Sequence, residues 1–104
     1  MAQSLLISNS FFKVMLKVLR VAGQTEPIEV TSRKQEGQKI HKCFVRLKEI
    51  GDNYTEYVAA VLGNGATVKY AEGTIVAADL SFTSHESQGV FYQDVLAREI
   101  VVLK

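Results

Sequence analysis

The chain has no tryptophan, one proline, one cysteine and no long apolar run. No apolar stretch approaches the ~20 residues that a helix needs to cross a bilayer. We therefore expect that this chain is not an integral membrane protein. The single Cys43 cannot form a disulfide within the chain. The first residues also lack a basic region followed by an uninterrupted apolar core. These absences predict a cytoplasmic protein rather than a secreted one.

An excess of charge of either sign is also missing. The formal net charge is +1, which predicts nothing about partners because a balance over the whole chain hides local fields. With 104 residues, 47% hydrophobic and 22% charged, the chain is expected to form one globular domain, residues 1–104, with a modest core. Met1 to Ser10 carry no charge, and we interpret them as a frayed terminus or as an extension of the first strand.

Groupings that would indicate catalysis or metal binding are scarce. His41 and His85 fall in different predicted elements, and Cys43 alternates with core positions. No Ser, Asp and Glu residues show a known catalytic spacing, and a metal site would need more His or Cys ligands. Gly63-Asn64-Gly65 lacks the Lys and Ser/Thr of a phosphate loop and is expected to be a turn. We therefore predict a protein that is not an enzyme and needs no cofactor or metal.

The strongest pattern lies in the last third of the chain. Alternating apolar residues from Glu72 lead into a polar loop, Thr83–Gly89, and resume from Val90 to Leu103. Two such runs joined by a polar turn predict a β-hairpin. The closing residues, Glu99–Leu103, are too apolar for a wetted strand, so we expect both faces to be covered, as in a barrel.

The first third allows two interpretations. Residues Phe11 to Ala22 could form a helix with one basic face, made of Lys13, Lys17 and Arg20, typical of an element on a membrane surface. They could also form a strand with alternating faces. Local pattern alone does not decide, but the glycine and proline that follow at positions 23 and 27 favour a bent strand.

The middle of the chain alternates clearly. Residues 31–39 are predicted to form a hairpin loop, and strands are predicted from Ile40 to Ile50 and from Tyr54 to Leu62. One face of the first of these strands holds Cys43, Val45 and Leu47, and the other holds Lys42, Phe44, Arg46 and Lys48. Residues 66–72 allow at most about two helical turns. The chain is thus predicted to be all-β, a sandwich or a small barrel.

Positive charge is concentrated in one loop and the strand after it, at Arg33, Lys34, Lys39, Lys42, Arg46 and Lys48. One interpretation is a solvated hairpin whose lysines discourage edge pairing. The other is a groove that follows phosphates, with aromatic rings as stacking surfaces for unpaired bases. The candidate rings are Phe44, Tyr54, Tyr57, Phe82 and Tyr92, and for each the alternative is packing in the core.

Several short motifs together resemble the bacterial single-stranded-DNA-binding protein family. Thr55-Glu56-Tyr57 followed by Val61-Leu62-Gly63 is similar to the Thr-Glu-Trp and Val-Leu-Phe-Gly of its third strand. Val68 with Glu72-Gly73 is similar to the start of its fourth strand. Tyr92-Gln93-Asp94-Val95 resembles its closing strand, and Glu26–Val30 resembles the segment after its first strand. The likeness covers roughly Phe11 to Leu103.

This resemblance implies a five-stranded Greek-key OB-fold barrel, with a short or absent helix between strands 3 and 4. It implies binding of single-stranded DNA, or of RNA, in replication or recombination, by a homodimer or homotetramer with no membrane partner. It also favours the strand interpretation of the first third. Tyr57 would replace a base-stacking Trp, and Phe82 lies near another stacking position.

The departures from the family pattern predict weaker binding. Ala59 stands where an Arg is common, Gly63 follows Leu62 where an aromatic is usual, and Trp is absent. The sequence reaches Lys104 without a flexible acidic tail, so we expect no recruitment of repair enzymes through one. The resemblance is thus to a minimal member of that family, comparable with the short primosomal proteins or with small phage and plasmid single-strand-binding-like proteins.

The predicted nucleic-acid-binding residues are Arg33, Lys34, Lys39, Lys42, Phe44, Arg46, Lys48, Tyr57, Phe82 and Tyr92. The alternative is an OB-fold module for protein interaction or assembly that has lost nucleic-acid binding. The balanced net charge and the missing tryptophans favour that alternative.

Overall fold

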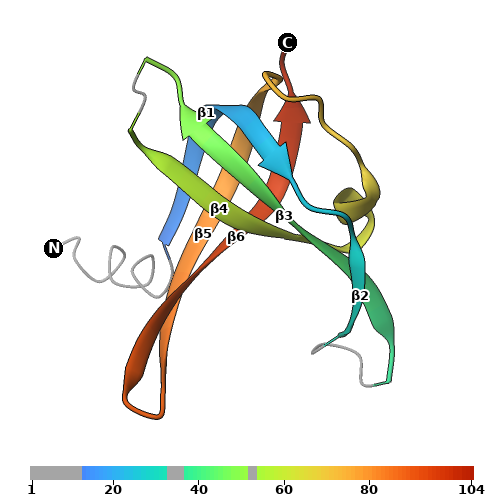
Figure 1. Ribbon diagram of the computed structural model, residues 1–104, viewed down its shortest axis with the longest axis vertical. Coiled ribbons are helices and arrows are strands. Elements are labelled where there is room, and N and C mark those ends of the chain that lie inside the picture. Colours follow the sequence, from blue (N-terminus) through green and yellow to red (C-terminus); the bar gives the residue numbers. More distant parts are fainter. Residues whose placement is uncertain (1–12, 33–36, 52–53) are drawn as a thin grey trace, which may run out of the picture.

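The computed structural model describes residues 13–32, 37–51 and 54–104, and within these ranges the chain forms strands and a single short 3₁₀ helix (Figure 1). The elements are β1 Lys13–Gln24, β2 Ile28–Thr31, β3 Lys39–Glu49, β4 Glu56–Leu62, η1 Gly63–Thr67, β5 Ile75–Ser87 and β6 Val90–Val102. The predicted all-β class is confirmed. The prediction for Met1 to Ser10 lies outside the described residues.

The strands form one sheet whose hydrogen bonding runs in a ring. Its order is β1-β5-β6-β4-β3-β2, and β1 also pairs with β3, so that β2 alone lies outside the ring. Neighbours are antiparallel except β4 and β6, which share the parallel pair Ala60 and Leu96. A register shift in β1 between Val21 and Gly23 bends the strand. The first part of β1 can therefore pair with β5 and its last part with β3.

The inner side of the ring holds the core. Alternation of side chains across each strand sends small and branched apolar residues inward from every strand of the ring. The buried set is Leu19, Val21, Cys43, Val45, Leu47, Ala59, Val61, Ala66, Val76, Ala78, Leu80 and Ala97. The predicted alternation of the strand from Ile40 to Ile50, with Cys43, Val45 and Leu47 on one face, is confirmed. Because these three are buried, the polar side of β3 must face outward.

The hairpin near the C-terminal end is longer than predicted. The polar run Thr83–Gly89 is not a loop, because β5 continues to Ser87 and pairs with β6 along its whole length. The turn consists of Gln88 and Gly89, with φ of 52° and 80°. Two-residue hairpin turns need such positive φ values, which glycine adopts freely. The polar residues of this run are therefore exposed residues of a continuous strand and do not interrupt it.

Two further expectations about apolar strands have different outcomes. The strand interpretation of the first third is confirmed by β1, and the helical one is wrong. The expectation that both faces of the closing strand are covered is also wrong, because Val101 and Val102 are each about half exposed. Leu16 and Val18 on the outer side of β1 are exposed as well. The outer sides of these strands thus face solvent, and the end of β6 is partly exposed on both sides.

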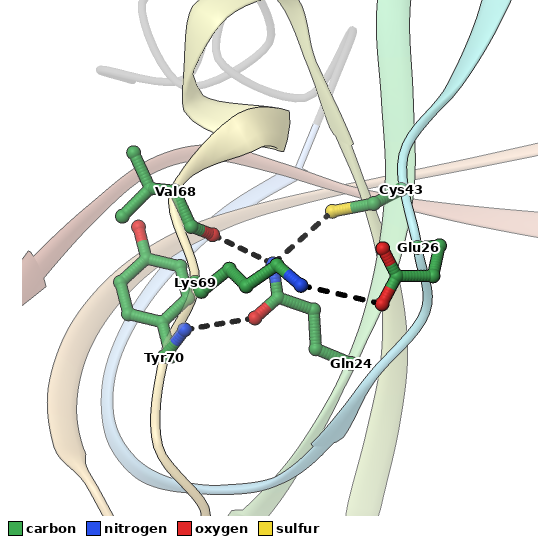
Figure 2. A network of polar contacts seen from close by, with 6 residues as sticks. All are labelled: Gln24, Glu26, Cys43, Val68, Lys69 and Tyr70. Atoms are coloured by element: carbon green, nitrogen blue, oxygen red, sulfur yellow. Dashed lines mark hydrogen bonds and ion pairs between the residues drawn. The ribbon is translucent and has the colours of Figure 1, made fainter.

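One end of the ring is closed by the side chain of Gln24 (Figure 2). Its Nε2 donates to the Val68 carbonyl at 2.7 Å, and its Oε1 accepts from the Tyr70 amide at 2.9 Å. The same Nε2 lies 3.7 Å from the Cys43 sulfur. These contacts hold the connection from η1 to β5 against β1 and β3. Burial raises the pKa of the Tyr70 phenol.

The opposite end is closed by a charged cluster. The Lys17 ammonium forms an ion pair with Glu49, and the Tyr57 hydroxyl donates to the same Glu49 oxygen at 2.8 Å. The Tyr57 ring meets Phe82 edge to face at 6.0 Å between centroids. The hydrogen bond to Glu49 raises the pKa of Lys17, and burial, followed by the Glu49 contact, raises the pKa of Tyr57.

Candidate nucleic-acid interface

The polar side of β3 forms a row of side chains on the outside of the ring. Lys42, Phe44, Arg46 and Lys48 alternate with the buried Cys43, Val45 and Leu47. Side chains on one face of a strand lie side by side at intervals of two residues. Four of the ten predicted binding residues are thus brought together by the structure.

Strand β4 extends this surface on one side. The register places Leu62 opposite Lys42, Ala60 opposite Phe44, Val58 opposite Arg46 and Glu56 opposite Lys48. Directly opposed side chains of an antiparallel pair lie about 4.5–5.5 Å apart at Cβ, so these eight residues form one surface. We call it the β3–β4 outer face. It combines three cations, one carboxylate, one aromatic ring and three exposed or half-buried aliphatic side chains.

The cations of this face differ in what they contact. The Lys42 ammonium lies 5.0 Å from the centre of the Phe44 ring, a distance typical of a cation–π contact. The Arg46 Nε lies 3.0 Å from Glu56 Oε1 and forms an ion pair with it. Within the described ranges Lys48 has neither an ion pair nor a side-chain hydrogen bond. Among the cations of this face, Arg46 is therefore the one paired with a carboxylate in the described part of the chain, and Lys42 and Lys48 keep their charge.

The sequence did not identify Arg20 and Glu56 as members of this surface. Arg20 is exposed on β1, and its partner in the β1–β3 register is Lys48. It therefore adds a fourth cation beside the face. Alternation alone could have placed Arg20 on the outer side of its strand and Glu56 with Val58 on one side of theirs. It could not have shown that both flank Lys48, because alternation defines faces and not strand partners.

Tyr57 and Phe82 lie on the other side of the sheet from these cations. Tyr57 is opposite Leu47 in the register and packs against the core, as Phe82 does. The resemblance implies that Tyr57 stacks on a base, which needs an accessible outward position. In the structure Tyr57 instead lies on the inner side of β4, the side that also holds the buried Ala59 and Val61.

The remaining predicted residues are dispersed. Tyr92 lies on the β5–β6 hairpin, where its ring stacks on His85 at 5.2 Å between centroids, and His85 Nδ1 lies 3.2 Å from Asp94 Oδ2. Lys39 is exposed at the start of β3, opposite Thr31 of β2. Arg33 and Lys34 lie outside the described residues. Neither Tyr92 nor Lys39 belongs to the β3–β4 outer face.

Two hairpins extend from the ring on different sides of this face. The paired ends of β2 and β3 form one, and the far half of β5 and β6 forms the other (Figure 1). The side chains of residues 83–94 on the second hairpin are exposed, and Phe91 among them is 81% accessible. An extended ligand on the β3–β4 outer face could therefore contact either hairpin as well.

Other kinds of site find no counterpart in the described ranges. No group of three His, Cys, Asp or Glu side chains there is placed to hold a metal ion. Those ranges also contain no helix whose length and apolar character would suit a bilayer crossing. Comparison with protein-family models, curated protein sequences and solved structures gives no match to this chain.

Proposed function

We propose that the chain is an OB-fold protein that binds single-stranded nucleic acid, DNA in the first instance, on the β3–β4 outer face. The observation that carries the proposal is the row of Lys42, Phe44, Arg46 and Lys48 on one exposed side of β3. Such binders combine cations, which attract the phosphate backbone, with flat or apolar side chains, on which bases stack. Both kinds of group are present on this face.

The order of the strands supports the OB-fold assignment. An OB-fold is a five-stranded, partly open Greek-key barrel that binds oligonucleotides on strands 2 and 3 and on the loops between strands 1 and 2 and strands 4 and 5. If β2 is counted as part of the first loop, the ring supplies the five strands. Strands 2 and 3 are then β3 and β4. The two projecting hairpins take the places of the two binding loops.

The proposed interface omits two residues that the sequence favoured. Tyr57 and Phe82 pack against the core, so stacking falls to Phe44, assisted by the exposed Val58. One ring gives fewer stacking contacts than several, and each stacked base is worth about 1–3 kcal/mol. We therefore expect binding to be weak and dominated by charge. A role in replication or recombination in the cytoplasm is part of the same proposal.

A fluorescence-anisotropy titration with labelled oligo-dT at several salt concentrations tests this proposal. If phosphates are neutralised by the cations of the face, log affinity falls linearly with log salt, with a slope of about −0.7 per phosphate contacted. The variant Lys48→Ala should reduce that slope by about 0.7. Lys69→Ala serves as the control, because Lys69 lies on the connection to β5 and is paired with Glu26. Binding that is absent, or indifferent to salt and to Lys48, would contradict the proposal.

Self-association accompanies the proposal as its expected assembly state. Leu16 is 75% exposed, and Val18, Ala77 and Val101 form an adjoining apolar row across β1, β5 and β6. A second copy could cover this apolar row. Light scattering of the wild type and of Leu16→Ser at tens of micromolar distinguishes a dimer or tetramer from an 11.5 kDa monomer.

A protein-interaction module remains the second candidate because of the exposed aliphatic side chains on the same face. Val58 and Leu62 of β4, with Ile28 of β2 opposite Lys42, give the surface an apolar component that phosphate binding does not need. Exposed apolar patches rimmed by polar residues are typical of protein contacts. In the titration above, this alternative predicts no measurable binding to oligonucleotide at low salt.

A further inference from the structure

Glu56 is the only acidic residue of the β3–β4 outer face, and it lies among the cations. The register places it directly opposite Lys48, with Arg46 on the diagonal position of the same surface. Its Oε1 is 3.0 Å from the Arg46 Nε, and the side chains of Arg46 and Glu56 are 53% and 42% exposed. The ion pair is thus formed at the surface, where a ligand can reach both partners.

We infer that Glu56 is an internal competitor of nucleic-acid phosphate for Arg46 and lowers the affinity of this face. The inference rests on the function proposed above. A guanidinium binds carboxylate and phosphate through the same planar set of donors, so the two anions are alternatives at the Nε side of Arg46. While Glu56 holds that side, the pair carries no net charge. Phosphate must then either displace the carboxylate or bind beside it against repulsion.

Lys42 provides an informative contrast on the same strand. Its ammonium also has an intramolecular contact, but the partner is the uncharged ring of Phe44. A cation–π contact leaves the positive charge in place, whereas the carboxylate of Glu56 cancels that of Arg46. Lys42 and Lys48 therefore remain available to phosphate. Of the three cations on the β3–β4 outer face, Arg46 is the one that a carboxylate neutralises within the described residues.

The test is the variant Glu56→Gln, which keeps the shape of the side chain and removes its charge. At about 0.1 M salt we expect its affinity for labelled oligo-dT to rise about twofold to fivefold, since half-exposed ion pairs are weak. The slope of log affinity against log salt should steepen by about 0.7, the contribution of one additional phosphate contact. Glu72→Gln, at an exposed position on the connection from η1 to β5, makes the same change in net charge outside the β3–β4 outer face and should alter neither quantity.

Removal of Arg46 separates competition from a general effect of charge. In the Arg46→Ala background, Glu56→Gln should no longer steepen the salt slope and should raise affinity much less. An equal gain with and without Arg46, or no gain in the wild-type background, would overturn the inference while leaving the proposed function intact. Failure of both the wild type and Glu56→Gln to bind at low salt would instead refute the proposed function and the inference with it. Thermal melting of each variant verifies that it is folded.

Discussion

The two ends of the ring are closed by different chemistry. At one end the uncharged amide of Gln24 holds the segment between η1 and β5 against the sheet through hydrogen bonds to Val68 and Tyr70. At the other end an ion pair between Lys17 and Glu49 is supplemented by the hydroxyl of Tyr57. Both ends use a polar residue on the inner side of β1, and the apolar layers lie between them.

Polar residues are tolerated on the inner side of this small ring of strands at its two ends. The inner side of β1 is fully buried at Leu19 and Val21 but only half buried at Lys17 and Gln24. Burial of a polar group is unfavourable unless its hydrogen bonds are made, and both ends provide them. An amide makes those bonds without a titrating charge. The charged end depends on the protonation of two groups, so the ends should respond differently to substitution and to pH.

The largest expected effect is at the charged end. Tyr57→Ala removes a ring that packs on Phe82 and the core, together with the hydrogen bond to Glu49. We expect a loss of about 2–4 kcal/mol in the free energy of unfolding, somewhat below the range for fully buried aromatic residues because Tyr57 is half-buried. Chemical denaturation measures this loss.

Tyr57→Phe is the matched control, and it should cost only about 1 kcal/mol, since the ring stays and one hydrogen bond is lost. Both variants should bind oligo-dT like the wild type when folded, because Tyr57 faces the core. A Tyr57→Ala protein that is as stable as the wild type but loses binding would show that this side chain stacks on a base.

A smaller effect is expected at the amide end. Gln24→Ala leaves the Val68 carbonyl and the Tyr70 amide without their partner, which should cost about 1–2 kcal/mol. Lys69→Ala, which breaks the exposed pair with Glu26 at the same end, should change stability by less than about 0.5 kcal/mol. Denaturant midpoints of the two variants measure the difference. If the two variants were equally stable, the bridging role of Gln24 would be refuted.

Much of this arrangement could be predicted from the sequence, but the partners of each strand could not. Alternation correctly separated Cys43, Val45 and Leu47 from the outward side chains of the same strand, because one side is clearly apolar. In β4 both sides are apolar, with Val58 on one and Ala59 on the other, so the pattern could not define the core side. The resemblance then placed Tyr57 outside.

The contacts that define the candidate interface depend on register and on a bulge. The pairing of Arg20 with Lys48 occurs just before the register shift at Val21 and Gly23. Glu56 can reach Arg46 because the β3–β4 register places Glu56 opposite Lys48, on the diagonal from Arg46. Neither relation leaves a signal in the local sequence, since register is determined by the packing of the whole sheet. The face could be predicted, whereas its internal ion pair could not.

The smallest expected effect is the dependence of stability on alkaline pH, and it distinguishes the ends most directly. The pKa of Lys17 is raised above 10.5 by Glu49, and the pKa of Tyr57 is raised above 10.0 by burial. Above about pH 10 the unfolded chain therefore loses these protons before the folded chain does. In that pH range the folded state binds more protons than the unfolded state. The stability that these two groups contribute at lower pH is therefore lost as the pH rises through their folded-state pKa values.

The double variant Lys17→Met with Tyr57→Phe should flatten the decline of the melting temperature between pH 9 and pH 11 more than Tyr70→Phe does. Tyr70 at the amide end also has a raised pKa, but it is one group and Gln24 beside it does not titrate. The flattening in the double variant should be modest, because the Lys17 and Glu49 side chains are each about one quarter exposed and solvent screens their interaction. An equal decline in the double variant and the wild type would show that the charged end contributes no pH dependence.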